Sequence, residues 1–63
     1  MSYFDEIFKQ SMNEKKGVTV YIGGQTIPGV VIKVNGGDTV EMRNREVSRI
    51  IVRIDRIDAV TIS

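Results

Sequence analysis

The stretch QTIPGVVIKVNGGDTVEMR, residues 25–43, decides the fold of this chain. It holds two runs rich in β-branched residues on either side of Asn35-Gly36-Gly37-Asp38, a composition typical of a turn. Pro28-Gly29 interrupts the first run, and within a strand this pair marks a bulge or a sharp bend. The stretch therefore predicts a long strand from Gln25 to about Val34, bent so that it serves two sheets, then a turn and a strand over 39–43.

The neighbouring segments continue the β pattern. Val18–Ile22 alternates as a first strand, and Gly23-Gly24 is a two-residue hairpin signal because both turn positions favour positive φ. Beyond residue 43, the pattern predicts a turn at 44–46, a fourth strand at 47–54 and a last strand at 57–62. The nine Ile, nine Val and four Thr of the chain lie almost entirely in this part. Residues 18–62 are thus expected to form a small, bent, partly open five-stranded barrel.

The residues before Gly17 have a different period. Apolar side chains at helical spacing form one stripe, made of Tyr3, Phe4, Ile7, Phe8 and Met12. This pattern predicts an amphipathic helix over about residues 2–13, with Ser2 as its N-cap and Gly17 as its stop. Such a short helix is marginal alone. We expect it to close an open end of the barrel, and the alternative is a detachable helix that binds a membrane or a partner.

Composition excludes several classes of function. With 63 residues the chain forms one domain, and without cysteine or histidine it has no disulfide, thiol nucleophile, histidine catalysis or Cys/His metal site. The acidic residues are scattered among lysines and arginines, so we expect no enzyme, no metal and no cofactor. Short apolar runs and an acidic start predict a cytoplasmic protein without membrane contact or small-molecule substrate. Oligomerisation is the remaining way to stabilise so small a core.

Two motifs carry a family resemblance. The first has the spacing of the first Sm motif and consists of Gly29, Val31, Val34, Asn35, Asp38, Thr39, Val40 and Met42. The second, Ile51-Val52-Arg53 followed by Ile57 and Val60, looks like the second Sm motif. Over about residues 3–62 the chain thus resembles an Sm-like (LSm/Hfq-type) protein, and the alternative is another SH3-like small barrel. The resemblance implies a helix followed by a bent five-stranded barrel.

The resemblance also implies a closed homomeric ring, here of five to seven subunits, in which the fourth strand of one subunit pairs with the fifth strand of the next. The residue pattern agrees, because apolar residues on both faces of the second strand exceed what one small core can bury. Residues expected at the subunit interface are Val47, Ile51, Ile57 and Ile62.

Binding of single-stranded RNA on the ring is the function that the resemblance implies, through Asn35, Asp38, Thr39 and Arg53. A second basic set surrounds the turn after residue 43 and comprises Arg43, Arg45 and Arg49. Tyr21 is a further candidate that either stacks a base or fills an interface. The alternatives are that Asn35 serves the turn, that Arg53 pairs with Asp55 or Asp58, and that the arginines around the turn are solvated charges.

The sequence leaves two candidate functions. The first is an RNA-binding Sm-like ring, with a role as a chaperone for small RNAs. The second is a structural or protein-binding ring that has lost the RNA pocket. The departures from the motifs at Asp38, Thr39 and Ile54 support the second, and the first is the preferred interpretation.

Overall fold

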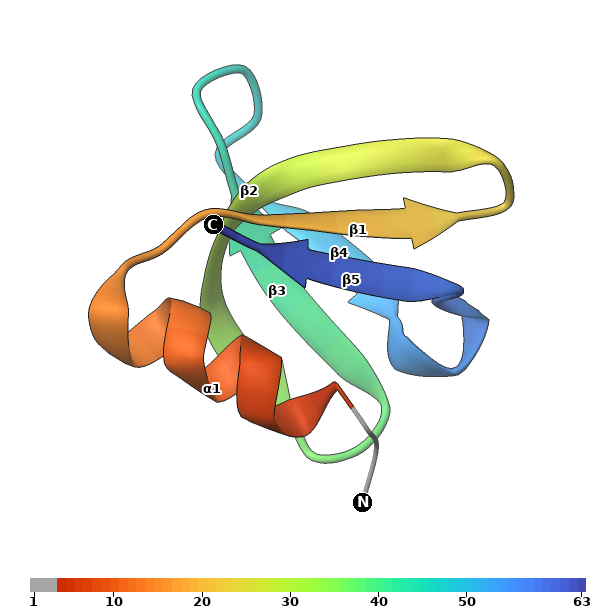
Figure 1. The fold of residues 1–63 in the computed structure, drawn as a ribbon, viewed down its shortest axis with the longest axis horizontal. Helices are drawn as coiled ribbons and strands as arrows, with labels where there is room; N and C mark the ends of the chain where they lie inside the picture. The colour runs from red at the N-terminus through yellow and green to blue at the C-terminus, as the bar shows by residue number, and fades with distance from the viewer. Residues whose placement is uncertain (1–3) are drawn as a thin grey trace.

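The computed structural model describes residues 4–63 and is mainly β, with one N-terminal helix and five antiparallel strands (Figure 1). The elements are α1 (Asp5–Glu14), β1 (Val18–Ile22), β2 (Gln25–Asn35), β3 (Thr39–Arg43), β4 (Ile50–Arg53), a single 3₁₀ turn η1 (Ile54–Arg56) and β5 (Ala59–Ile62). The strand order is β4-β3-β2-β1-β5. This arrangement confirms the fold class that the sequence predicts.

Strand β2 bends at its middle and serves two halves of the sheet, as expected. Its first half, up to Gly29, pairs with β1, and its second half, from Val30, pairs with β3. A bulge between Val31 and Lys33 leaves Ile32 without a partner in the β3 register. The hairpin at Gly23 and Gly24 has φ values of 56° and 80°, which agrees with the predicted turn.

The sheet curls but does not close into a barrel. Among the described residues, β4 pairs only with β3 and β5 only with β1. The two strands therefore form the edges of the sheet, and each presents a row of backbone N–H and C=O groups outside the ladder. The open sheet edges agree with the partly open barrel that the sequence predicts.

The core lies between the curled sheet and α1. Its fully buried members are Phe8, Val18, Val20, Val31, Val40, Met42, Val52 and Ile54. Because Phe8 has no exposed surface, α1 is docked against the body in this structure (Figure 1). In the part of the chain described, no helix has the length and apolar character needed to cross a membrane.

Both C-terminal strands are shorter than predicted, because side-chain hydrogen bonds hold the backbone before them. Residues 47–49 belong to a turn in which Asn44 Oδ1 accepts hydrogen bonds from the N–H groups of Glu46 and Val47. Residues 57–58 lie outside β5, where Asp58 donates its N–H to the Tyr21 carbonyl and its carboxylate accepts from Gly23 N–H. Residue 54 belongs to η1 instead of β4.

Helix α1 begins and ends later than predicted. Its N-cap is Phe4, and the proposed cap Ser2 and the apolar residue Tyr3 lie outside the described residues. Its C-terminus is closed at Lys15, which adopts the left-handed conformation with φ 55°, so Gly17 is not the stop. This end of the helix therefore turns two residues before the glycine, and Lys15 is exposed at the turn.

The buried hydroxyl of Ser11 ties α1 to the sheet. Its oxygen accepts a hydrogen bond from Val31 N–H at 3.1 Å and the hydroxyl donates to the Lys16 carbonyl at 2.6 Å. Ser11 has no exposed surface, so water does not reach either partner readily. One hydroxyl thus satisfies a backbone N–H of β2 beside the bulge and a backbone carbonyl that follows α1.

We expect Ser11→Ala to lower the free energy of unfolding by about 1–3 kcal/mol, because it leaves the Val31 N–H and the Lys16 carbonyl unpaired. Urea denaturation followed by circular dichroism, at one fixed protein concentration, measures this change. Ser48→Ala is the matched control, since Ser48 is exposed in the turn before β4. Equal midpoints for the two variants would show that the hydroxyl does not hold the helix to the sheet.

Candidate nucleic-acid interface

The loop after β2 and the end of β4 meet in one hollow. Thr39 pairs with Arg53 across β3 and β4, and Ile54 N–H donates to the Asp38 carbonyl at 2.9 Å. The resulting hollow of about 300 Å³, here named the Arg53 hollow, is lined by Gly37, Asp38, Thr39, Arg53 and Asp55. Three of the four residues that the motif resemblance marks for RNA thus line one surface.

Polar contacts already engage several of these groups. Arg53 Nη2 donates to Asp55 Oδ2 at 3.0 Å, and both side chains are more than half exposed. The fourth residue, Asn35, donates from Nδ2 to Thr39 Oγ1 at 3.1 Å. The Arg53 hollow therefore contains one guanidinium and the carboxylates of Asp38 and Asp55. The Thr39 hydroxyl and the neighbouring Asn35 amide are further hydrogen-bonding groups. Because the Arg53–Asp55 pair is solvent-exposed, it is weak and can be exchanged for another anion.

A second basic group lies around the turn after β3. Arg43 and Arg45 line an open hollow of about 410 Å³ together with Val30, Asn44 and Ser48. The third member, Arg49, lies with Nε 3.6 Å from the carboxylate of Glu41. The turn is linked to β2 by a hydrogen bond that Asn44 Nδ2 donates to the Pro28 carbonyl at 2.8 Å. The structure thus brings Arg43 and Arg45 together and pairs Arg49 with an acidic neighbour.

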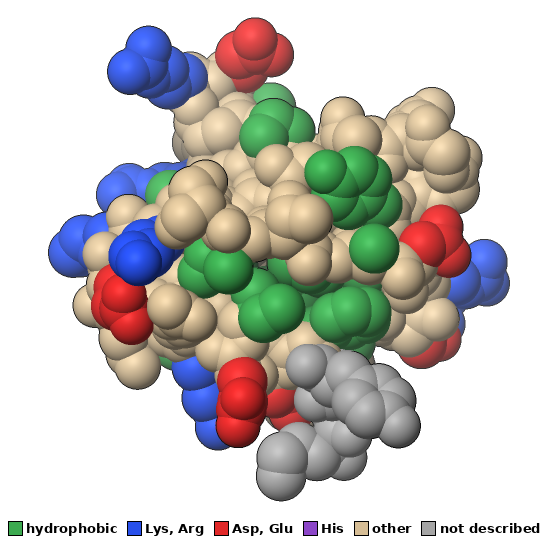
Figure 2. Space-filling view, in the orientation of Figure 1, with side chains coloured by type: hydrophobic (Ala, Val, Ile, Leu, Met, Phe, Trp, Pro, Cys, Tyr) green, Lys and Arg blue, Asp and Glu red, His purple; other side chains and the backbone are tan. Residues whose placement is uncertain are grey.

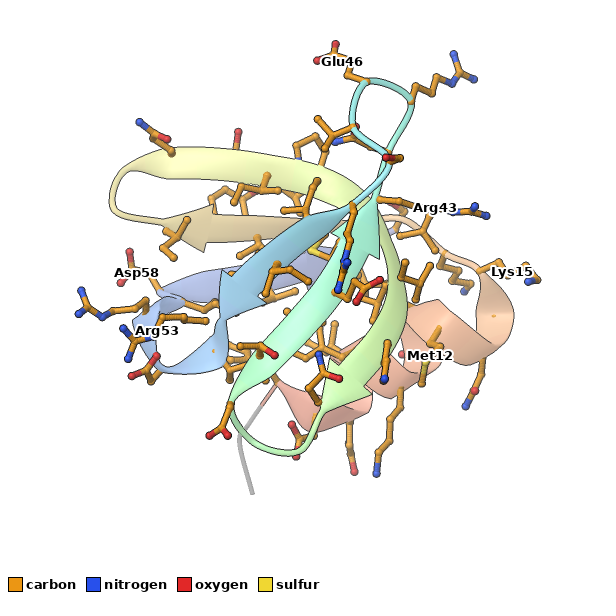
Figure 3. All side chains as sticks on the ribbon, turned by 180° about the vertical axis from the view of Figure 1, so that it is seen from behind. Met12, Lys15, Arg43, Glu46, Arg53 and Asp58 are labelled. Atoms are coloured by element: carbon orange, nitrogen blue, oxygen red, sulfur yellow. The ribbon has the colours of Figure 1, made fainter. Side chains whose placement is uncertain are left out.

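The two basic regions lie apart. Figure 3 shows Arg53 and Asp58 toward one side of the molecule, whereas Arg43 lies toward the other side, where it lines a hollow with Met12 and Lys15 of the α1 end. Tyr21 lines neither hollow and lies in β1, where it pairs with Thr26 and Ala59. The residue is 38% exposed and its carbonyl accepts a hydrogen bond from Asp58 N–H.

The residues proposed for the subunit interface fall into two groups. Ile51 and Val47 are large hydrophobic residues at 50% and 44% exposure, and Ile51 lies on the edge strand β4. Ile57 and Ile62 are half-buried and pack against the core. Figure 2 shows hydrophobic side chains gathered over the region of β5 and the adjoining side of α1. Apolar surface therefore remains exposed or half-exposed along both sheet edges.

Sequence reasoning did not identify Met12 and Lys15 as surface-site residues. Both line a further hollow with residues of β2 and with Arg43. Met12 belongs to the apolar stripe of α1, and the stripe alone does not distinguish a core residue from one at a groove. Only the docking of the helix beside the β2 bulge brings these residues next to Arg43.

Comparisons of the chain with protein-family models, with curated proteins and with solved structures find no match. Within residues 4–63, no three Asp or Glu side chains come close enough together to hold a metal ion.

Proposed function

We propose that this chain forms an Sm-like homo-oligomeric ring of five to seven subunits that binds single-stranded RNA. The observation that carries the proposal is the strand order, which leaves β4 and β5 as the two edges of a curled antiparallel sheet. Pairing β4 of one subunit with β5 of the next satisfies both edges, and repetition of that contact around an axis closes a ring.

The composition of the edges supports this contact. Ile51 is half exposed within β4, Ile57 precedes β5 and Ile62 ends it, both with part of their surface uncovered. Burying these side chains between subunits contributes on the order of 25 cal/mol per Å² of apolar surface. A chain of 63 residues has a small core of its own, so this contribution is a large share of its stability.

RNA binding is assigned to the Arg53 hollow, which is repeated once in each subunit of the ring. Arg53 contributes a cationic guanidinium that can contact phosphate or stack on a base, and Asn35 and Thr39 contribute hydrogen-bonding groups. Among residues 4–63 no aromatic side chain lines the hollow, so base stacking is weak and contact with phosphate is the larger part of the affinity. We therefore propose modest affinity and little base preference.

A scaffold ring without RNA is the second candidate, and a specific observation favours it. The Arg53 hollow has two carboxylates, those of Asp38 and Asp55, beside one guanidinium that is already paired. Its local formal charge is negative, which repels phosphate. The two candidates share the ring and differ in whether the hollow takes RNA.

Substitutions in the Arg53 hollow separate these candidates. We expect wild-type protein to bind a labelled oligouridine at low salt, with a slope of log affinity against log salt of roughly −0.7 for each phosphate neutralised. Arg53→Ala should weaken binding and flatten the slope. Asp55→Asn should strengthen binding, because it removes a carboxylate and frees the guanidinium. Fluorescence anisotropy at two salt concentrations, with oligouridine, oligoadenosine and a mixed sequence, measures these effects.

Lys9→Ala is the matched control for the loss of one positive charge, since Lys9 is exposed on α1 and does not line the hollow. Absence of oligonucleotide binding even at low salt would favour the scaffold. Equal losses from Arg53→Ala and Lys9→Ala would exclude the Arg53 hollow as the RNA site and point to the arginines around the turn.

A further inference from the structure

Two adjoining hollows form a groove between the end of α1 and the turn after β3. The first, of about 240 Å³, is lined by Met12, Lys15, Val30, Val31, Ile32 and Arg43. The second shares Val30 and Arg43 with the first and adds Arg45. We name this surface the Lys15–Arg43 groove. Figure 3 shows Met12, Lys15 and Arg43 on the same side of the molecule, with Lys15 reaching outward from the end of α1.

The groove carries an uncompensated positive charge. Lys15, Arg43 and Arg45 form no ion pair with any of the described residues, whereas Lys16, Arg49 and Arg53 each pair with a carboxylate. Among residues 4–63, no Asp or Glu lines either hollow. The chain as a whole has a formal charge of only +1, so most acidic residues are placed on other surfaces. A concave surface lined by cationic side chains alone attracts an anionic ligand.

The floor of the groove is aliphatic. Ile32 is 37% exposed because the bulge in β2 pushes it out of the ladder, and the half-buried side chains of Met12 and Val30 lie with it in the first hollow. Unbranched methionine adapts to differently shaped apolar partners. Within the part of the chain that the structure describes, no aromatic ring lines either hollow, so these residues offer no platform on which nucleic-acid bases stack.

The location of the groove leaves it open when the sheet edges are covered. Val30 and Ile32 belong to β2, the middle strand of the order β4-β3-β2-β1-β5. Pairing at β4 and β5 therefore does not use these residues. In an oligomer the groove is repeated once in each subunit, and several copies of a weak site produce avidity toward a multivalent partner.

We infer that the Lys15–Arg43 groove binds an acidic peptide segment of a partner protein in which carboxylates flank an aliphatic side chain. The aliphatic side chain occupies the first hollow, against Met12 and Ile32. The carboxylates lie against Lys15 and Arg43, and the planar guanidinium of Arg43 accommodates a carboxylate in two parallel hydrogen bonds. Arg45 extends the positive charge along the peptide. This inference does not depend on RNA binding and concerns a different surface from the Arg53 hollow.

The test uses the whole 63-residue chain and a labelled peptide that alternates glutamate with leucine. We expect binding by fluorescence anisotropy at low ionic strength. A peptide alternating glutamate with serine, which lacks the anchor, and one alternating lysine with leucine, which reverses the charge, should each bind at least tenfold more weakly. Arg43→Gln and Lys15→Gln, both at exposed positions, should each weaken binding of the first peptide several-fold.

Lys33→Gln is the matched control, because Lys33 is exposed on the same strand as Ile32 but does not line the groove. The inference is overturned if Lys33→Gln lowers affinity as much as Arg43→Gln, or if the serine peptide binds as tightly as the leucine peptide. An oligouridine could instead displace the peptide completely and bind more tightly than the peptide does. If Arg43→Gln also weakened binding of that oligouridine, the groove would be assigned to RNA.

Discussion

Ile51→Lys is expected to convert the assembled protein into a folded monomer. In a single chain the substitution is compatible with the fold, because Ile51 is half exposed and lies opposite Glu41 in the β3–β4 register. A lysine there faces a carboxylate across the strands. In the proposed contact between β4 and β5 of neighbouring subunits, by contrast, the same ammonium would be desolvated among apolar side chains at a cost of several kcal/mol. Since about 1.4 kcal/mol is a factor of ten, each contact weakens by more than about a hundredfold.

Light scattering at micromolar concentration measures the mass, and circular dichroism shows whether the monomer keeps its β content. Ile32→Lys is the control, since it places the same charge at a similarly exposed isoleucine on the central strand β2. We expect it to retain the wild-type mass. A wild-type protein of 7.1 kDa in solution, or an Ile51→Lys variant that assembles normally, would rule out the proposed ring contact.

The first half of the sheet could be predicted from the sequence because local chemistry determines it. Alternation defines β1, two glycines at positive φ define the first hairpin, and the β-branched run with an internal Pro28-Gly29 defines a bent β2. These signals act between residues close in the chain. The predicted bounds of β1 and β3 agree with the structure, and β2 extends one residue further.

The ends of β4 and β5 could not be predicted, because distant partners fix them. Asn44 satisfies the backbone of the turn before β4, and Asp58 contacts the β1–β2 hairpin some 35 positions earlier in the chain. An alternating apolar pattern continues through these residues and gives no sign that side-chain hydrogen bonds replace the ladder there.

The candidate sites likewise include one that the sequence predicted and one that it did not. The motif resemblance selected Asp38, Thr39 and Arg53, and the β3–β4 register brings them to one hollow. The partner of Arg53 was one of two alternatives, and the structure selects Asp55. The Lys15–Arg43 groove had no sequence signal, because it needs the docking of α1 and the β2 bulge together.

Gly29→Ala is expected to destabilise the fold more than a glycine-to-alanine substitution at any other position of the chain. A Cβ at this position would lie 2.6 Å from the Arg43 carbonyl oxygen, and the Cε of Met42 lies 3.4 Å away. The close atom belongs to the backbone, where β2 passes from pairing with β1 to pairing with β3. It cannot swing aside as the end of a side chain can. The strands must separate, and overpacking of this kind costs about 1–3 kcal/mol.

That cost is a large fraction of the roughly 3–5 kcal/mol that so small a core supplies. We therefore expect a fall of many degrees in the melting temperature, or loss of the folded state at 37 °C. Thermal and urea unfolding followed by circular dichroism, at a fixed protein concentration, measures the effect. Gly37→Ala is the matched control, because its Cβ would meet nothing within 4 Å and its φ is not positive. We expect that variant to match the wild type or to exceed it slightly. Equal stability of the two variants would mean that β2 and β3 cross less closely at Gly29 than the structure shows.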